Sequence, residues 1–134
     1  MNSPVEHARS LLARARDDLF VVRSLRGLRD APVWVLGFHA QQAVEKLLKA
    51  VLTHAGVEYP RTHNLVMLTE LLDGTPHAKP GDSDQFDRLV PFAVFFRYEG
   101  AAGDEPPPID PQWLDDVARR TEAWAAQIVG QVPS

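Results

Sequence analysis

The sequence predicts an all-α fold: an antiparallel up-and-down helical bundle of four main helices plus one short helix, in a single domain over residues 1–134. Two observations predict this fold. Apolar residues recur at steps of three and four in five separate segments, which is the spacing of amphipathic helices. No segment alternates polar and apolar residues over the length of a strand between turn residues. The chain is also ordinary for one globular domain, with 134 residues, 45% hydrophobic and 24% charged.

The first helix is expected from about Pro4 to Leu25. Ser3 can cap its free amides, Pro4 suits the first helical position, and Glu6 can reach back to close a capping box. The apolar residues of this segment form one seam: Val5, Ala8, Leu12, Ala15, Leu19 and Val22. Such a straight seam is typical of a helix in a bundle.

The second helix is expected from about Asp30 to Gly56, where the glycine suits a left-handed C-cap. Its apolar residues lie on more than one side of the helix: Trp34, Val35, Leu36, Phe38, Val44, Leu47, Leu48, Val51 and Leu52. A helix this apolar is expected to be buried on most sides. We therefore expect one side to face the chain's own core and another to face a second subunit, which makes the protein a homodimer.

A short third helix is expected from about His63 to Leu72, and residues 73–81 read as a loop because they contain Gly, Pro and Thr. The next helix is expected to begin at Asp82. Pro91 falls inside it, so we expect either a kink or a later start of the helix.

The last helix follows a long Pro-rich loop over residues 100–111. Asp110 is expected to cap this helix and Pro111 to occupy its first position. Its apolar seam is Leu114, Val117, Thr121, Trp124 and Ile128.

The composition excludes several classes of protein. The chain has no cysteine, which excludes disulfides, a thiolate nucleophile and a cysteine-based metal site. No apolar run reaches the ~18 residues of a membrane span, and the N-terminal residues do not have the pattern of a signal peptide. We therefore expect a cytoplasmic protein that does not associate with a membrane.

The net charge of -4 is unevenly distributed. Residues 1–61 hold 9 Lys/Arg and 6 Asp/Glu, a net charge of +3, whereas residues 62–134 hold 5 and 12, a net charge of -7. Arg9, Arg16 and Arg23 recur every seven residues and so form a basic stripe about 21 Å long on the first helix. We expect this stripe to be a solvated face with acidic partners, and binding of a polyanion is the alternative.

The sequence contains no metal-binding pattern and no phosphate-binding glycine loop, so no metal and no cofactor are expected. Two acidic pairs stand adjacent in the sequence, namely Asp17 with Asp18 and Asp115 with Asp116. Neighbours on a helix point about 100° apart. These pairs are therefore not expected to share a proton, and we expect them to be solvated.

A polar stripe runs along the otherwise apolar second helix. His39, Gln42, Lys46 and Lys49 follow one another at steps of 3, 4 and 3. Buried polar groups need partners. We therefore expect these residues to form an interior polar network that fixes the packing of the bundle.

A second polar cluster, containing Arg61 and His63, stands where the third helix begins. Its residues can serve as helix caps, or Arg61 and His63 can flank an anion at a helix N-terminus. In an antiparallel bundle the third helix leaves one end and the fourth helix returns to that end. Arg97 and Tyr98 end the fourth helix, so we expect them to lie near Arg61 and His63. We therefore predict that any ligand binds between Arg61, His63, Arg97 and Tyr98. The alternative is that Arg61 pairs with Glu58, and Arg97 with Glu99 or Asp104.

Residues 38–52, FHAQQAVEKLLKAVL, are followed by a glycine, then by RTHNL and by FFRYEG. In this order, and over roughly residues 8–130, the sequence resembles the HEPN family of small prokaryotic helical domains. The resemblance implies a helical bundle that commonly forms homodimers. It also implies a minimal nucleotidyltransferase encoded nearby, in a pair that behaves as toxin and antitoxin. Many HEPN proteins are metal-independent ribonucleases, and others are thought to bind nucleotides or similar polyanions.

The ribonuclease members carry an arginine, then four to six residues, then a histidine. None of the histidines of this chain follows an arginine at that spacing. Arg97-Tyr98 is also followed by Glu99, where the family usually has proline. His63 and Arg97 remain the candidates for a catalytic site assembled from distant residues.

Three hypotheses follow. The first is a homodimeric binding module for a nucleotide, RNA or a nucleotidyltransferase partner, which does no chemistry. The second is a degenerate metal-independent ribonuclease in which histidine supplies acid and base catalysis and arginine holds the scissile phosphate. The third is a structural interaction protein. The missing arginine–histidine spacing favours the first and the third.

Overall fold

The computed structural model describes residues 3–97 and 109–130, and the side chains of all of these except residues 94–97. Within these ranges the chain forms helices and no strand, so the prediction of an all-α bundle is confirmed. The helices are α1 (Pro4–Arg26), α2 (Val33–His54), α3 (Leu65–Glu70), the 3-10 helix η1 (Leu71–Gly74), α4 (Ser83–Asp87), α5 (Val90–Arg97) and α6 (Pro111–Val129).

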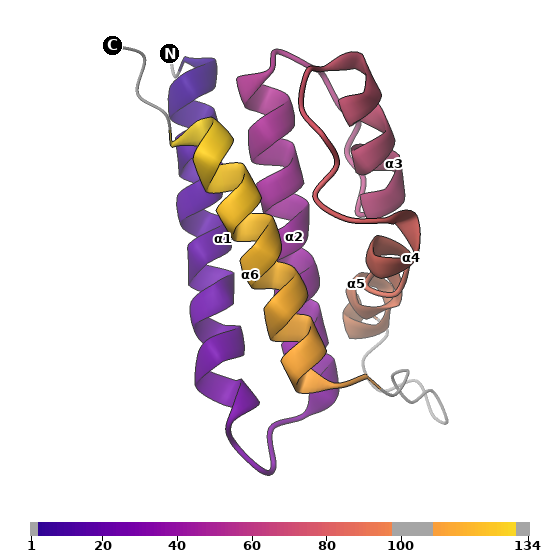
Figure 1. The fold of residues 1–134 in the computed structure, drawn as a ribbon. Helices are drawn as coiled ribbons and strands as arrows, with labels where there is room; N and C mark the ends of the chain where they lie inside the picture. The colour runs from indigo at the N-terminus through magenta and orange to yellow at the C-terminus, as the bar shows by residue number, and fades with distance from the viewer. Residues whose placement is uncertain (1–2, 98–108, 131–134) are drawn as a thin grey trace.

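The three long helices form the body of the molecule. α1, α2 and α6 all pack against one another (Figure 1). α1 and α2 are joined at one end by residues 27–32 and run in opposite directions, as expected. α6 begins near the end where α2 begins and runs in the same direction as α2, so the long helices do not strictly alternate.

The ends of the long helices are set by the residues that the sequence indicates. The Ser3 hydroxyl accepts a hydrogen bond from the Glu6 amide at 3.1 Å, and Pro4 occupies the first turn of α1. At α6, the Asp110 carboxylate accepts from the Gln112 amide at 3.0 Å. After α2, Gly56 adopts a φ of 76°, the left-handed conformation expected of it.

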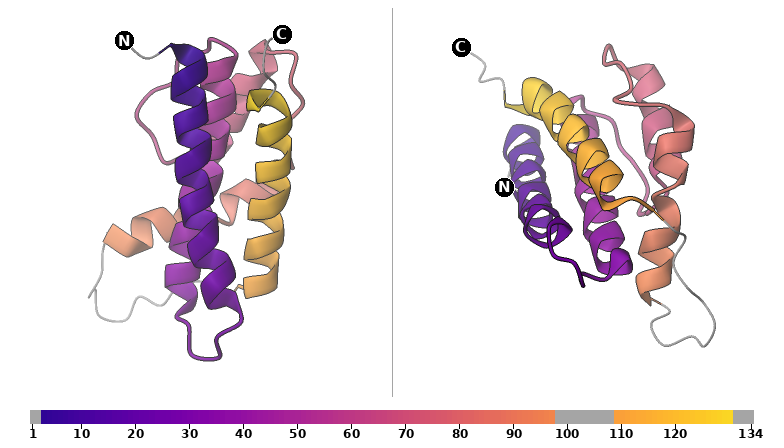
Figure 2. Two further views of the ribbon diagram at one scale, coloured as in Figure 1. Left: turned by 90° about the vertical axis from the view of Figure 1, so that its left-hand side faces the viewer. Right: turned by 60° about the horizontal axis from the view of Figure 1, so that its bottom comes forward.

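The short helices α3, η1, α4 and α5 lie along one side of α2 (Figure 2). The expected helix from Asp82 is interrupted. α4 ends at Asp87, and α5 begins at Val90 with Pro91 in its first turn, where the missing amide proton costs no helical hydrogen bond. The break is therefore placed by the proline. We call α3, η1, α4 and α5 the short-helix flank.

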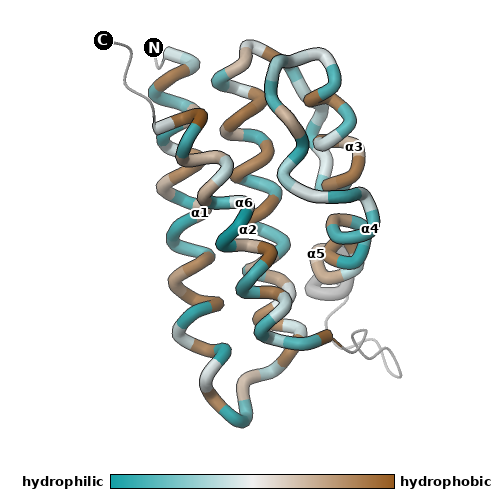
Figure 3. Tube along the Cα trace, viewed as in Figure 1, coloured by the Kyte–Doolittle hydropathy of each residue, from teal (hydrophilic) through white to brown (hydrophobic). Residues whose placement is uncertain are grey.

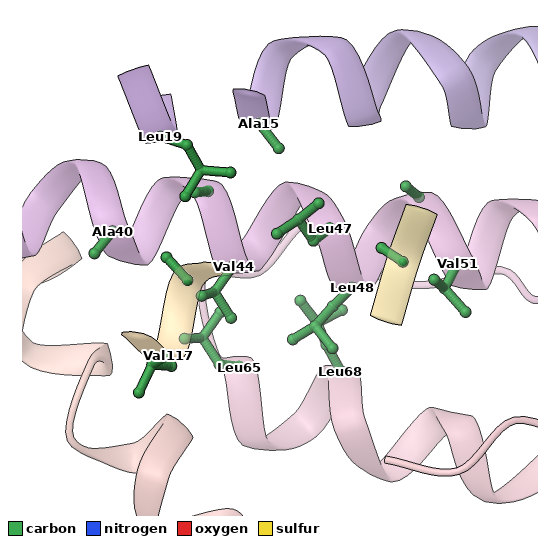
Figure 4. Close-up of a cluster of buried hydrophobic side chains, with 14 of the residues drawn as sticks. Ala15, Leu19, Ala40, Val44, Leu47, Leu48, Val51, Leu65, Leu68 and Val117 are labelled. Atoms are coloured by element: carbon green, nitrogen blue, oxygen red, sulfur yellow. The ribbon is translucent and has the colours of Figure 1, made fainter. Parts of the chain in front are cut away.

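The core lies between α2 and its neighbours. Figure 4 shows Val44, Leu47 and Leu48 of α2 packed among side chains of α1, α3 and α6. Leu48 is fully buried within a single chain, so it does not need a second subunit to cover it. Trp34 and Phe38 are half-buried. The apolar excess of α2 is thus smaller than the sequence suggested, because the short-helix flank covers part of it.

α2 and α5 approach each other closely at a glycine. A Cβ atom placed on Gly37 would lie 2.1 Å from a ring carbon of Phe92, which is itself buried. Phe92 therefore fills the space that a side chain at position 37 would need.

Hydrophobic and hydrophilic positions alternate along the helices, whereas the connection over residues 75–82 is mostly hydrophilic (Figure 3). This connection is held to the body by Trp124, whose indole N–H donates to the Ala78 carbonyl at 2.9 Å. In the described part of the chain, no helix is both long and apolar enough to cross a membrane.

Candidate functional site

The polar stripe of α2 is bound to acidic and amide groups on both of its sides. His39, Gln42, Lys46 and Lys49 are each half-buried, and each takes part in a hydrogen bond. Their partners are Asp18 of α1 and two buried residues of α2 itself, Gln41 and Glu45. Every charged or polar member of the stripe thus has the partner that burial requires.

Asp18 links α1 to α2. Its carboxylate lies 3.0 Å from Nδ1 of His39 and 2.5 Å from Nζ of Lys46. We call Asp18, His39 and Lys46 the Asp18 triad. Its side-chain exposures are 12% for the carboxylate and 27% for each basic residue, so the acid lies beneath the bases.

Glu45 makes a second cluster of the same kind. One carboxylate oxygen lies 2.7 Å from Nδ1 of His63, and the other accepts a hydrogen bond from Nζ of Lys49 at 3.0 Å. We call Glu45, Lys49 and His63 the Glu45 triad. The Gln41 amide donates to Glu45 at 3.1 Å and to the main-chain carbonyl of His63 at 3.3 Å, which ties the segment before α3 to α2.

The surroundings of Glu45 favour its charged form. Burial raises the pKa of this carboxyl, but its hydrogen bonds more than reverse that effect. The donors, in order of effect, are His63, Lys49 and Gln41. As a result the pKa of Glu45 lies below its ordinary value of 4.5, and a buried carboxylate sits at the centre of the cluster at neutral pH.

An open cavity of about 440 Å³ lies over the Glu45 triad and is lined by Lys49, Arg61, Thr62 and His63. We call it the Lys49–Arg61 cavity. Arg61 is exposed and makes no ion pair with any residue that the structure describes, Glu58 included. The Thr62 hydroxyl accepts a hydrogen bond from the Asn64 amide at 3.0 Å, which leaves its own proton available as a donor. The cavity can therefore offer cationic and hydroxyl donors to one anionic group.

The structure brings two of the expected ligand-binding residues, Arg61 and His63, to one cavity. Arg97 is the last residue of α5, but its side chain lies outside the described part of the structure, as does Tyr98 together with Glu99 and Asp104. It therefore stays a prediction that Arg97 and Tyr98 contribute to this cavity. It also stays a prediction that Arg97 pairs with His63 in a catalytic site.

The expectation that both acidic pairs are solvated was wrong for one member of each pair. Asp18 is 9% exposed and Asp115 is 0% exposed. Because neighbours on a helix point in different directions, one acid of each pair faces the bundle. Asp115 is compensated by ion pairs of 3.3 Å with Arg26 and 3.2 Å with Arg119, although neither has hydrogen-bond geometry.

The basic stripe of α1 has an acidic partner on α6. Arg16 lies 3.5 Å and Arg23 lies 3.7 Å from the Glu122 carboxylate. Arg9 is exposed and takes no part in the pairing. These contacts favour the solvated face with acidic partners over a polyanion site on this helix.

The chain matches one protein-family model over most of its length. The family model described as HEPN domain matches residues 8–123, which is most of the chain. The chain belongs to the HEPN family. Neither the curated proteins nor the solved structures gave a match. Membership supports a general role as a nucleotide- or RNA-related module, and HEPN domains often dimerise.

In this HEPN domain, the sequence pattern located the basic residues of the site but missed their acidic partners. The acidic Glu45 and the amide Gln41 were not singled out, and Asp18 was expected to be solvated. A local signal existed for two of them, because Gln41, Glu45 and Lys49 follow one another at steps of four on one helix. No local signal existed for Asp18, since its partners stand 21 and 28 residues away.

Proposed function

We propose that this HEPN protein is a binding module for phosphate groups of a nucleotide or of RNA, and that it works as a homodimer. The observation that carries the proposal is the Lys49–Arg61 cavity, in which Lys49, Arg61 and His63 surround one opening above a buried carboxylate. Arginine and lysine are the usual donors to phosphate, and charge-assisted hydrogen bonds are stronger than neutral ones.

The roles of the basic residues differ. Glu45 neutralises much of the charge of Lys49 and holds its ammonium group in place. Arg61 has no such partner in the described structure, so its full charge is left for a ligand. We therefore assign the main attraction to Arg61 and the positioning of Lys49 and His63 to Glu45.

Replacing Arg61 with alanine is expected to weaken the binding of a nucleoside 5′-monophosphate and of inorganic phosphate by about 10- to 100-fold, since one charge-assisted hydrogen bond to an ionic group contributes about 1.5–3 kcal/mol. Isothermal titration calorimetry of both ligands measures this. Arg29→Ala is the matched control, because Arg29 is also exposed and makes no ion pair within residues 3–97 and 109–130. Equal affinity of the Arg61→Ala variant and the parent would show that the ligand binds elsewhere.

The proposed homodimer has its own test. Phe20 is 71% exposed and Leu28 is 59% exposed, so two large apolar side chains face solvent in the single chain. Exposed apolar surface of this kind often marks a contact with another protein. Sedimentation equilibrium at micromolar concentration is expected to give about twice the chain mass of 14.9 kDa. A single species of 14.9 kDa would contradict the dimer.

We also propose a nucleotidyltransferase as a physiological partner, in a toxin–antitoxin pair. This part rests on the HEPN family and on no contact in the chain itself. Co-purification of the two proteins when their neighbouring genes are expressed together tests it directly.

A further inference from the structure

The Lys49–Arg61 cavity is graded from a buried acid to an exposed base. The Glu45 side chain beneath it is 7% exposed, and the Lys49 side chain is 16% exposed. The His63 side chain is 40% exposed, and Arg61 is exposed. An anion that enters from solvent therefore meets Arg61 first and Lys49 second, and the negative charge of Glu45 opposes any deeper entry.

The charges around this cavity do not cancel. Glu45 carries a negative charge at neutral pH, because its hydrogen bonds hold its pKa below the ordinary value. Lys49 and Arg61 carry one positive charge each, which leaves a surplus of one positive charge before His63 is counted. Protonation of His63 adds a second. The attraction to a ligand therefore grows with the number of negative charges on that ligand.

Three different side chains of the lining can donate hydrogen bonds to one ligand. The ammonium group of Lys49 has three protons, of which one is donated to Glu45. Arg61 presents a fork of N–H groups and makes no ion pair with any residue that the structure describes. The Thr62 hydroxyl accepts from the Asn64 amide, so its own proton is left to donate. The lining thus suits a group with three acceptor oxygens.

The two kinds of phosphate ester differ in these properties. A phosphomonoester has three terminal oxygens and, with a second pKa of about 6, a charge of about -1.5 to -2 at neutral pH. A phosphodiester has one terminal oxygen fewer and a single charge, and it continues as a chain on both sides. The described lining is one residue of α2 and three consecutive residues, 61–63. It therefore forms a place for one end group rather than a track along a chain.

We propose that the Lys49–Arg61 cavity is selective for a terminal phosphomonoester over a phosphodiester, and that Thr62 determines this selectivity. Lys49 and Arg61 each bind one terminal oxygen of the ester. The Thr62 hydroxyl donates to the third terminal oxygen, which is esterified in a diester. This inference rests on the function proposed above and names the kind of phosphate that the cavity prefers.

The first experiment uses a matched pair of ligands, a nucleoside 5′-monophosphate and its methyl ester, which is a phosphodiester of nearly the same shape. Isothermal titration calorimetry measures both at about pH 7.5, where the monoester is mainly doubly charged. The parent protein is expected to bind the monoester at least about tenfold more tightly, because the methyl ester lacks one charge and one charged acceptor. Arg61→Ala is expected to weaken both.

The second experiment tests Thr62 itself. Thr62→Val is expected to weaken the binding of the monoester by about tenfold and to leave that of the diester nearly unchanged. Thr62→Ser keeps the hydroxyl and should bind both esters as the parent does. Thr75→Val is the matched control, because Thr75 accepts the His77 amide at 3.2 Å as Thr62 accepts the Asn64 amide, but does not line the cavity. Circular dichroism checks that the variants fold, and a merely structural role of Thr62 would weaken both esters alike.

A phosphomonoester can belong to a free nucleotide or to the phosphorylated end of a chain. A dinucleotide with a 5′-phosphate and the same dinucleotide without it separate these sources. In both cases the unphosphorylated dinucleotide is expected to bind at least about tenfold more weakly than the phosphorylated one. Tighter binding of the phosphorylated dinucleotide than of the monophosphate assigns the ligand to a chain end, and equal binding of these two assigns it to a small molecule.

Three outcomes overturn the inference. If the parent binds the monoester and its methyl ester equally, while Arg61→Ala weakens both, the selectivity is absent and the proposed function stands. If Thr62→Val weakens both esters by the same factor, Thr62 does not determine the selectivity. If neither ester nor inorganic phosphate binds the parent protein, the proposed function fails together with the inference.

Discussion

Replacing Glu45 with alanine is expected to lower the free energy of unfolding by about 3 kcal/mol, because removing one partner of a buried ionic cluster leaves the others uncompensated. Glu45 is 5% exposed, and it contacts Lys49, His63 and Gln41. Chemical denaturation followed by circular dichroism measures the change. The same substitution is expected to weaken phosphate binding less than Arg61→Ala does, because Lys49 and His63 lose the group that positions them while Arg61 keeps its charge.

Two variants make this result interpretable. Glu70→Ala changes an exposed glutamate that is in no ion pair within the described residues, and it should alter the free energy of unfolding by less than about 0.5 kcal/mol. Glu45→Gln keeps the shape of the side chain but not its charge. If Glu45→Ala destabilises the protein no more than Glu70→Ala does, the cluster contributes nothing to the fold.

The pH dependence of stability follows from the same residue. The pKa of Glu45 lies below 4.5 in the folded chain, so the unfolded chain binds more protons as the pH falls. The stabilisation from Glu45 is therefore complete above about pH 5 and is lost as the pH falls through the folded-state pKa. Because glutamine does not titrate, the Glu45→Gln variant should show a flatter loss of stability over this acidic range than the parent.

Replacing Gly37 with alanine is expected to destabilise the fold by about 2 kcal/mol, as overpacking of a core does. The new Cβ would meet ring atoms of Phe92 at 2.1, 2.4 and 2.5 Å, and a phenyl ring cannot bend away as a flexible chain can. Either α2 and α5 separate or Phe92 leaves its place. Thermal and chemical unfolding of the variant measure the cost.

Gly27→Ala is the control for this prediction, since no atom lies within 4 Å of a Cβ placed there. It is expected to leave stability unchanged or slightly raised. Gly37→Ala should cost less in a Phe92→Ala background than in the parent, because alanine lacks the Cγ, Cδ1 and Cε1 atoms that the new Cβ would meet. A fully stable Gly37→Ala variant would mean that the two helices are not in tight contact.

Most of the fold could be predicted from the sequence because the signals are local. The caps at Ser3 and Asp110, the left-handed Gly56 and the break at Pro91 each depend on residues within one helical turn. The direction of α6 could not be predicted, since it depends on how the short-helix flank returns along α2.

The site could be predicted only in part. The basic members of the Lys49–Arg61 cavity stood out because charges are unusual on an apolar helix and at a helix start. The burial of Asp18 and Asp115 was missed because it depends on partners from other helices or on the packing of α1 against α2. Helical spacing shows which residues share a face, but not which face of a neighbouring helix meets it.

The shortness of the flank helices has a thermodynamic consequence. α3 has 6 residues and α4 has 5, and helices of this length do not persist in water without tertiary contacts. The flank is therefore the part of the fold that should open by local unfolding, while α1, α2 and α6 stay closed. Of the residues that line the Lys49–Arg61 cavity, Lys49 belongs to α2, which stays closed, whereas Arg61 lies in the segment just before α3, in the part that opens. Any anion that binds both residues is thereby linked to the closed state, so occupancy of the cavity and order in the flank rise together.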